Sequence, residues 1–217
     1  MKVFQIGAAG GIGRPLAARL VQRGDQVVGM HRKADQADTV SATGAIPVLG
    51  DLISDSADEL ADKMEGSDAV VFSAGAHGTG VDQTTLIDGK GLEKAADAAA
   101  QVGVSRFVLV SVFPEAGRAK GRGEPFEHYM RVKKSADVEL VRSELDWVIV
   151  RPGTLTDHSG DDKVTAGLAI EYGEVKRENV AAFIEQALYT PQLNRVIVEL
   201  TDGPTPVDEA VTKLLQV

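Results

Sequence analysis

The chain has 217 residues, of which 43% are hydrophobic and 25% are charged, proportions that fit one globular domain with a substantial core. It has no cysteine, which excludes disulfides, catalytic thiols and cysteine-ligated zinc or iron–sulfur centres. The net charge of −9 argues against nucleic acid as a partner, because phosphate backbones are also negative. No apolar run approaches membrane-spanning length and no basic leader precedes the first strand-like run, so we expect a cytoplasmic protein without a membrane partner.

Short runs rich in β-branched residues alternate with longer stretches of helical periodicity. The runs that predict strands are residues 2–6, 26–30, 45–48, 69–74, 106–111, 147–150 and 196–200. The stretches that predict helices are residues 12–23, 57–64, 84–102, 127–142 and 179–188. The alternation indicates an α/β fold with a doubly wound (Rossmann) parallel sheet, formed by a single domain over residues 1–217. Glycine and proline interrupt the pattern after Arg151, so we expect a small C-terminal substrate-side region, with loops mainly at residues 112–126 and 151–175.

A glycine-rich loop follows the first strand and opens the first helix. Its spacing, with Gly7, Gly10 and Gly13 three residues apart, is typical of a dinucleotide site. The first glycine permits a tight turn, the second lets the backbone approach a pyrophosphate, and the third lets the helix pack closely on the strand. A glycine-rich turn without a ligand is the alternative, and the strand-to-helix context favours the dinucleotide. The loop residues expected to bind the cofactor are Gly7, Ala9, Gly10, Gly11, Ile12, Gly13 and Arg14.

The end of the second strand distinguishes NADP(H) from NAD(H). An NAD site usually has an acidic residue there, about 20 residues after the loop, which binds the ribose 2′-hydroxyl. This chain has Arg32 and Lys33 instead, and two cations favour the 2′-phosphate of NADP(H), with Arg14 able to assist from the loop. A solvated basic corner is the alternative, with Asp35 as a late ribose acid, so NAD(H) stays open as the second cofactor.

Small residues and one acid follow the third and fourth strands. Asp51 and Leu52 come after the third strand, where an aspartate beside the adenine can accept a hydrogen bond from its exocyclic amine. Ser73, Ala74 and Gly75 end the fourth strand, where small side chains leave room for a cofactor. Ordinary loop chemistry is the alternative at both places.

A tyrosine and a lysine four residues apart lie on one face of the helix predicted over residues 127–142. The phenol of Tyr129 ordinarily has a pKa of about 10, and the ammonium of Lys133 is expected to lower it, which makes the tyrosine a general acid. Surface packing of a tyrosine over a lysine stem is the common alternative for this spacing. The helix follows the fifth strand, which ends at Ser111, and a bound nicotinamide lies at this carboxyl edge of the sheet. Ser111 is therefore expected to hydrogen-bond a substrate carbonyl.

Taken in order, these motifs resemble those of short-chain dehydrogenases/reductases. The narrower resemblance is to their atypical, NmrA-like branch of small NAD(P)-binding proteins, described as epimerases or dehydratases, with flavin and biliverdin reductases among the relatives. It spans nearly the whole chain and is carried by the glycine loop, Gly50-Asp51-Leu52, Ser73-Ala74-Gly75-Ala76, Asp88-Gly89-Lys90-Gly91, Ser111, Tyr129 with Lys133, and Arg151-Pro152-Gly153. The resemblance implies hydride transfer from the nicotinamide to a carbonyl or conjugated acceptor, with Tyr129 donating the proton.

The resemblance also implies the remaining roles. Ser111 orients the acceptor oxygen, Lys133 binds the nicotinamide ribose, and Pro152 and Gly153 line the nicotinamide face. We therefore predict an NADPH-dependent oxidoreductase that acts on a small carbonyl, quinone or flavin-like acceptor. A non-catalytic NADP(H)-binding redox sensor of the NmrA-like type is the alternative. The expected partner is a small-molecule substrate, no metal site is expected among the dispersed histidines, and we expect a monomer or homodimer.

Overall fold

The computed structural model describes residues 1–76, 80–116, 121 and 123–216. Its strands are β1 (Lys2–Ile6), β2 (Gln26–His31), β3 (Ile46–Leu49), β4 (Ala69–Phe72), β5 (Arg106–Val110), β6 (Asp146–Pro152), β7 (Thr154–Thr156), β8 (Lys163–Gly167), β9 (Glu174–Lys176), β10 (Val196–Asp202) and β11 (Thr205–Pro206). Its helices are α1 (Gly13–Gln22), α2 (Ala37–Ser41), α3 (Ala57–Met64), α4 (Val81–Thr84), α5 (Gly91–Gln101), α6 (Glu124–Arg142), α7 (Arg177–Leu188) and α8 (Val207–Leu214). A 3₁₀ turn, η1 (Ala34–Gln36), and a π-helical turn, η2 (Thr85–Lys90), complete the elements.

The main sheet has the strand order β11-β8-β10-β6-β5-β4-β1-β2-β3. Pairing is parallel from β3 through to β10, whereas β8 runs antiparallel to both β10 and β11. The order reverses between β1 and β4, because the chain builds outward from β1 to β3 and then returns to the other side of β1. This order confirms the predicted doubly wound Rossmann sheet, and it places a ligand crevice at the carboxyl ends of β1 and β4.

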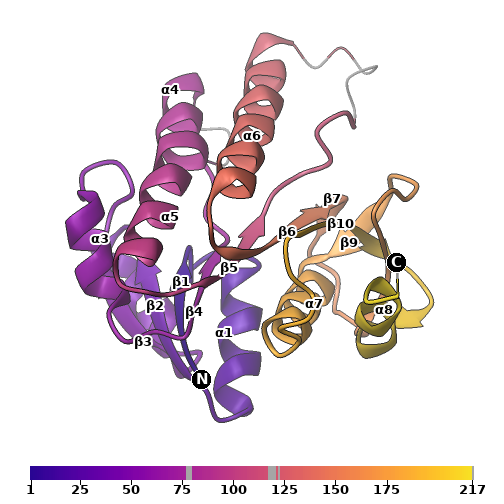
Figure 1. Cartoon of the computed structure of the whole chain (residues 1–217), viewed down its shortest axis with the longest axis horizontal. Helices are drawn as coiled ribbons and strands as arrows, with labels where there is room; N and C mark the ends of the chain where they lie inside the picture. The colour runs from indigo at the N-terminus through magenta and orange to yellow at the C-terminus, as the bar shows by residue number, and fades with distance from the viewer. Residues whose placement is uncertain (77–79, 117–120, 122, 217) are drawn as a thin grey trace.

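Helices cover both faces of the sheet. Helices α1, α7 and α8 lie against one face, and α3, α5 and α6 lie against the other (Figure 1). Successive residues of a central strand point to opposite faces, so Val3 packs in the core beneath α1 and α7 while Phe4 packs in the core beneath α3 and α5. The central strands are therefore apolar on both faces, as parallel strands between two helical layers must be.

The region after Arg151 has more regular structure than the sequence indicates. Where loops were expected over residues 151–175, the structure has β7, β8 and β9. Strand β8 extends the main sheet beside β10, and β7 pairs with β9 in a separate two-stranded sheet. These strands have only three to five residues each, too few to show a period of two, and their partners are distant in the sequence.

The other expected loop, residues 112–126, lies partly outside the described residues, which omit 117–120 and 122. Its last residues belong to α6, which begins at Glu124 with Pro125 in its first turn, a position that tolerates proline. The short helices α2 and α8 were not predicted.

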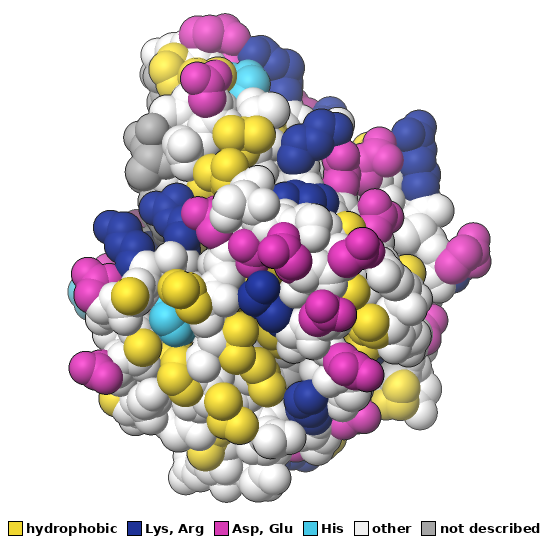
Figure 2. Space-filling model, turned by 90° about the vertical axis from the view of Figure 1, so that its left-hand side faces the viewer, with side chains coloured by type: hydrophobic (Ala, Val, Ile, Leu, Met, Phe, Trp, Pro, Cys, Tyr) yellow, Lys and Arg dark blue, Asp and Glu magenta, His cyan; other side chains and the backbone are white. Residues whose placement is uncertain are grey.

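Figure 2 shows the side of the molecule that lies at the left of Figure 1, with hydrophobic side chains gathered towards the bottom and charges of both signs above them. Two of the exposed hydrophobic side chains of the protein belong to the edge strand β3, where Ile46 is 48% and Leu49 is 57% exposed. None of the helices in the described ranges combines the length and apolar character that crossing a bilayer requires.

Candidate active site

The carboxyl ends of β1, β4, β5 and β6 lie along one edge of the sheet. The segments that follow them are the glycine loop at residues 7–12, then Ser73 and Ala74, then Ser111, and then Gly153. Parallel neighbours end on the same side, so these segments lie next to one another although they are far apart in the sequence. The topology therefore assembles most of the predicted site residues.

The glycine loop has a conformation that needs its glycines. Gly7 has a φ of +87°, and a Cβ there would lie 2.7 Å from the backbone nitrogen of Ala74. A Cβ at Gly13, the first residue of α1, would collide with the carbonyl oxygen of Gly7. Beneath the loop, the buried side chain of Gln5 donates from Nε2 to the Gly13 carbonyl oxygen at 2.8 Å. These contacts support Gly7 as the tight turn and Gly13 as the point of close helix–strand packing.

A cavity, here called the nucleotide cavity, lies over the ends of β1, β2 and β4. Nine residues of its lining were predicted to bind the cofactor: Gly7, Ala9, Gly10, Arg32, Asp51, Leu52, Ser73, Ala74 and Gly75. The other lining residues are Ile6, Met30, His31, Gln36, Gly50 and Ile87. The hydroxyl of Ser73 donates to the carbonyl oxygen of Ile6 at 3.1 Å, and the Asp51 carboxylate accepts the N–H of Ile53 at 2.8 Å. Both side chains thus stabilise the loops that form the cavity wall.

A second cavity, here called the reaction cavity, continues from the first past Gly10, Ser73, Ala74 and Gly75, which line both. Its lining consists of Gly10, Gly11, Ile12, Ser73, Ala74, Gly75, Asp88, Val110, Ser111, Val112, Tyr129, Lys133, Pro152, Gly153, Leu155 and Arg177. The three predicted catalytic residues, Ser111, Tyr129 and Lys133, are all in this lining, as are Pro152 and Gly153. The two cavities are adjacent because they share four lining residues, and together they are called the cleft.

The predicted cations at the nucleotide end differ in position. Arg32 is exposed and lines the nucleotide cavity. Lys33 is exposed and lines neither cavity, and its carbonyl oxygen lies 2.9 Å from Nδ1 of His31. Arg14 is exposed near the start of α1 and is also outside both linings. Of these three residues, Arg32 is the one that lines the nucleotide cavity, and Lys33 and Arg14 stay predictions.

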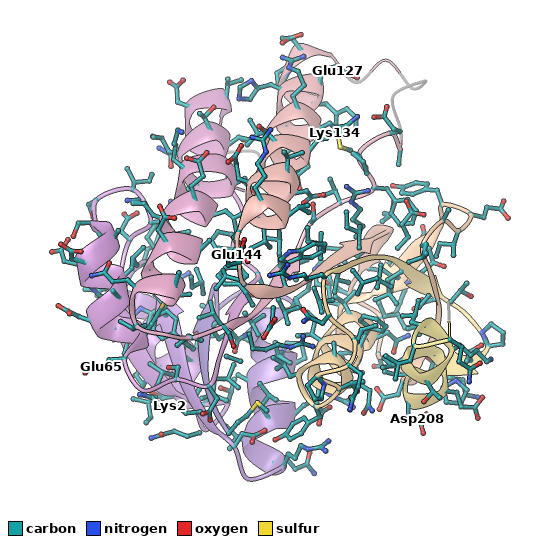
Figure 3. The ribbon with its side chains drawn as sticks, viewed as in Figure 1. Lys2, Glu65, Glu127, Lys134, Glu144 and Asp208 are labelled. Carbon is teal, nitrogen blue, oxygen red and sulfur yellow. The ribbon has the colours of Figure 1, made fainter. Side chains whose placement is uncertain are left out.

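Lys133 is buried although it is charged, with only 2% of the residue exposed. Its Nζ donates to the carbonyl oxygen of Val110 at 2.9 Å and lies 3.6 Å from Oδ1 of Asp88, which is itself 1% exposed. Lys134, the next residue, points outward from α6 and pairs with Glu115 at 2.8 Å (Figure 3). Helix α6 thus turns one of two adjacent lysines inward, where a buried charge requires an opposite charge.

Tyr129 lies one turn before Lys133 on the same face of α6 and is half-buried. Burial raises the pKa of its phenol well above the ordinary value, and the negative charge of Asp88 raises it further. The expectation that Lys133 lowers this pKa is therefore wrong. The ammonium of Lys133 is held by Val110 and Asp88, and the carboxylate that compensates it also acts on the phenol. Tyr129 keeps its proton at neutral pH.

Ser111 is buried at the end of β5, where its backbone N–H donates to the carbonyl oxygen of Val150 at 2.7 Å. Its Oγ makes no hydrogen bond of normal geometry within the described chain, although it lies near enough to the Asp137 carboxylate to favour the ionised form of that group. Asp137 accepts Nε and Nη2 of Arg151 at 2.9 and 2.8 Å. Burial raises the pKa of Asp137, and Ser111 and Arg151 oppose that shift. Ser111 therefore connects the reaction cavity to a buried ion pair.

The cleft has the shape and the residues of a dinucleotide site, and comparison with known proteins identifies its family. A family model described as NAD(P)H-binding matches residues 7–191. The chain belongs to this NAD(P)H-binding family. The match begins at the first glycine of the loop and extends past the end of α7, so it contains both cavities. The predicted kinship with atypical, NmrA-like short-chain dehydrogenases/reductases is confirmed at the level of the family.

Relatives in this NAD(P)H-binding family cover almost the whole chain. A Bacillus subtilis protein named as an uncharacterised sugar epimerase, YhfK, is 38% identical over 216 residues, which are 99% of this chain and 100% of its own. A Bacillus halodurans structure described as an NAD-dependent epimerase/dehydratase has a TM-score of 0.90 and 32% identity, covering 99% of this chain and 100% of that chain. ChuY from Escherichia coli O157:H7, described as an anaerobillin reductase, has a TM-score of 0.79 and 25% identity, covering 94% and 100%. The relatives thus include a reductase.

The described residues of this NAD(P)H-binding chain fit a dinucleotide in the cleft. Gly7 and Gly13 let the loop pack tightly, because a Cβ at either would collide with backbone, and the loop leads into the N-terminus of α1, which favours an anion. Two residues of the reaction cavity, Asp88 and Ser111, each have a buried oxygen without a hydrogen-bond partner in the described chain. Oδ1 of Asp88 faces the Lys133 ammonium at 3.6 Å, so the Ser111 hydroxyl is the group of the two with capacity for a hydrogen bond to a ligand.

Gln36, Asp88 and Arg177 are polar residues among those in the cleft lining that the sequence did not predict. Asp88 belongs to the motif Asp88-Gly89-Lys90-Gly91, but the spacing of that motif does not show that the carboxylate is buried. Arg177 marked only the start of a helix; its side chain lies over Gly11, where a Cβ would be 2.6 Å from its Cδ. Gln36 lies in η1, which was not predicted. One sequence signal could have found these three residues. Each lies at or just before the start of a helix, and helices of this fold begin near the carboxyl edge of the sheet, where ligands bind.

Proposed function

We propose that this chain is an NADPH-dependent oxidoreductase that transfers hydride to a small carbonyl, quinone or flavin-like acceptor, with Tyr129 as the general acid. The observation that carries the proposal is the reaction cavity, in which Ser111, Tyr129 and Lys133 share one lining with the glycine loop. A general acid must lie within reach of the oxygen that it protonates. The reductase among the relatives supports the same class of reaction.

The cofactor, when bound, supplies hydride from C4 of its nicotinamide ring. Tyr129 donates its phenol proton, which it carries at neutral pH, to the acceptor oxygen. Ser111 donates from Oγ to the same oxygen and thereby orients it. An ammonium has three donors, and Lys133 places one on Val110 at hydrogen-bond distance, so it retains donors for a ribose hydroxyl. The buried Pro152 and Gly153 exclude water from one wall.

We also propose that NADP(H) is preferred over NAD(H), with Arg32 as the residue that recognises the 2′-phosphate. Arg32 lines the nucleotide cavity, and a guanidinium binds a phosphate through two parallel hydrogen bonds. NADPH is therefore expected to bind at least about ten times more tightly than NADH, which corresponds to about 1.4 kcal/mol. Fluorescence titration of the purified protein with each cofactor measures this ratio, and comparable dissociation constants would contradict the preference.

An acceptor panel tests the reaction. Purified protein is incubated with NADPH and a series of carbonyl, quinone and flavin acceptors, and oxidation of NADPH is followed by its absorbance. Tyr129→Phe removes only the phenol hydroxyl, so we expect kcat to fall by about 100-fold or more, as for a lost general acid, with little change in the Kd of NADPH. Tyr189→Phe is the matched control, because Tyr189 hydrogen-bonds Asp25 and lies outside both cavity linings. Equal turnover by wild type and Tyr129→Phe would refute the acid role.

A non-catalytic NADP(H)-binding redox sensor is the second candidate, and a specific observation favours it. The raised pKa of Tyr129 makes the phenol a weaker acid than one whose pKa is lowered by a nearby lysine. The same acceptor panel separates the two functions. Tight NADPH binding without oxidation by any acceptor supports the sensor, whereas turnover that is lost in Tyr129→Phe supports the enzyme.

A further inference from the structure

Asp88 is a buried carboxylate that none of the cofactor-binding motifs explains. It is 1% exposed and belongs to the π-helical turn η2, between α4 and α5. Its Oδ2 accepts the N–H of Ala76 at 3.0 Å, and its Oδ1 has no hydrogen-bond partner among the described residues. π-Helical turns are rare and occur frequently at functional sites. Here the turn places a carboxylate in the lining of the reaction cavity.

Two oxygens fix the ammonium of Lys133 beside this carboxylate. Nζ of Lys133 lies 2.9 Å from the carbonyl oxygen of Val110 and 3.6 Å from Oδ1 of Asp88. The two charged side chains are 3% and 1% exposed, so water screens their interaction little. Removing either partner would leave the other as an unpaired buried charge, and each therefore holds the other in place.

The charged or titratable groups near Tyr129 in the described part of the chain come from three elements. Lys133 and His128 come from α6 itself, and Nε2 of His128 lies 2.8 Å from a threonine hydroxyl. Asp88 comes from η2 and is the acid within the described lining of the reaction cavity. Arg177 comes from α7 and already pairs with an exposed carboxylate at 2.6 Å. Asp88 is thus the charge that acts on the phenol of Tyr129, where it opposes ionisation, and Lys133 is the cation paired with Asp88.

We propose that Asp88 is a positioning residue that opposes formation of the Tyr129 phenolate, by holding the Lys133 ammonium against its own carboxylate and the Val110 carbonyl. This role rests on the proposed function. It also predicts in which direction, carbonyl reduction or alcohol oxidation, the reaction runs. Reduction of a carbonyl needs a neutral phenol that donates a proton, whereas oxidation of an alcohol needs a phenolate that accepts one. The arrangement therefore disfavours alcohol oxidation at neutral pH, which leaves reduction as the preferred direction.

The reductive step balances with the groups at hand. The acceptor carbon receives the hydride that the bound cofactor supplies, its carbonyl π bond opens toward oxygen, and that oxygen takes the phenol proton of Tyr129. The two electrons gained by the acceptor are those of the hydride. The phenolate left on Tyr129 experiences the negative charge of Asp88, so it regains a proton from solvent before the next turnover. Oxidation would require that same unfavourable phenolate at the outset.

Direct titration of the phenol tests this role without cofactor or acceptor. The chain has three tyrosines, so the difference in phenolate absorbance between a protein and its Tyr129→Phe counterpart isolates Tyr129. In the wild type we expect a midpoint above the value of about 10 for free tyrosine. Asp88→Asn keeps an oxygen that can accept from Ala76 but removes the charge. It is expected to lower the Tyr129 midpoint by about one pH unit or more, because Lys133 is then uncompensated.

Two further variants serve as controls. Asp82→Asn removes an exposed acid from the neighbouring helix α4, and we expect no change in the midpoint. Asp88→Glu retains the charge and is expected to keep the midpoint high. A midpoint in folded Asp88→Asn equal to that of the wild type overturns the role of Asp88. If Asp88→Asn does not fold, the titration midpoint of Tyr129 in the wild type is the test. A wild-type midpoint at or below that of free tyrosine also overturns the role of Asp88.

The pH profile of the reduction gives a readout that a purely structural role would not move. In the wild type the rate is expected to stay constant into the alkaline range, and in Asp88→Asn to fall at a lower pH as the phenol loses its proton; identical profiles would overturn the role. Absence of turnover with every acceptor would refute the proposed function but would leave the titration of Tyr129 unaffected, so the two failures are distinguishable.

Discussion

The nucleotide cavity and the reaction cavity share part of one lining but are built by different means. The nucleotide end depends on backbone shape, because Gly7 has a φ of +87° beside Ala74 and the cationic residue, Arg32, is exposed. The reaction end depends on buried charge, because Lys133 and Asp88 are 2% and 1% exposed. A backbone cradle selects a ligand by shape, whereas a buried ion pair sets the protonation state of its neighbour. Substitutions at the two ends should therefore affect different quantities.

The adjacent lysines of α6 give the largest expected effect. Lys133→Met leaves Asp88 as an unpaired buried charge, and we expect the free energy of unfolding to fall by about 3–5 kcal/mol. Lys134→Met removes an ion pair with Glu115 in which both side chains are 59% exposed, and a change of about 1 kcal/mol or less is expected. Urea unfolding at neutral pH measures both. Similar losses in the two variants would contradict the contrast between the inward and outward lysines.

Two glycines with positive φ sharpen the comparison at the nucleotide end. Gly7 (+87°) and Gly24 (+96°) are both left-handed, so alanine at either position costs about 1 kcal/mol of stability or more. Only at Gly7 would the Cβ meet backbone, 2.7 Å from the nitrogen of Ala74, whereas nothing lies within 4 Å at Gly24. We expect Gly7→Ala to raise the Kd of NADPH about tenfold or more and Gly24→Ala to leave it unchanged. Cofactor titration distinguishes them, and an unchanged Kd in Gly7→Ala would rule out the cradle.

Arg32 and Lys33 form the next pair. Arg32→Ala is expected to lower the ratio of NADPH to NADH affinity about tenfold, since a charged hydrogen bond to the 2′-phosphate is lost. Lys33→Ala should change that ratio little, because Lys33 lies outside both linings. Parallel titrations with both cofactors give the ratios. An equal change in the two variants would show that Arg32 and Lys33 both bind the 2′-phosphate and would contradict a role for Arg32 alone.

Asp161 lies outside the cleft and gives the smallest effect, on stability alone. Hydrogen bonds from Asn179 and Lys176, at 2.9 and 3.1 Å, lower the pKa of Asp161 to about 2. Because this value lies below that of an ordinary aspartate, about 3.9, the stabilisation is present above pH 4 or so and is lost as the pH falls toward 2. Asp161→Asn should therefore be less stable than wild type at neutral pH, with the difference vanishing near pH 2. The exposed Asp62→Asn is the control, and a difference that persists in acid would exclude this cause.

The fold could be predicted wherever the signal is local. Seven strands and five helices, α1, α3, α5, α6 and α7, were predicted in the right order, because apolar runs and helical spacing repeat along the chain. Strand β8 was not, because Lys163–Gly167 has one fully buried apolar residue, Val164, and pairs with a strand more than 30 residues away. Short strands at the edge of a sheet depend on such distant partners, which a single sequence does not show.

In the candidate site, too, local features could be predicted from the sequence and long-range contacts could not. The roles of Gly7 and Gly13 follow from spacing alone, because backbone shape is encoded in the glycines themselves. The spacing of Tyr129 and Lys133 correctly places both on one face of α6, but it does not show that η2 brings a buried carboxylate to Lys133. The direction of the pKa shift at Tyr129 depends on that long-range contact, and so the expectation of a lowered pKa failed.

A crystal structure with NADPH bound tests most directly that one cleft binds NADP(H) at one end and carries out proton transfer at the other. We predict the 2′-phosphate against Arg32, the pyrophosphate over Gly10, and the nicotinamide between Gly153 and the Tyr129 hydroxyl, with room for an acceptor within hydrogen-bond reach of Tyr129 and Ser111. A nicotinamide that lies outside the reaction cavity, or a 2′-phosphate in solvent away from Arg32, would contradict this division of the cleft.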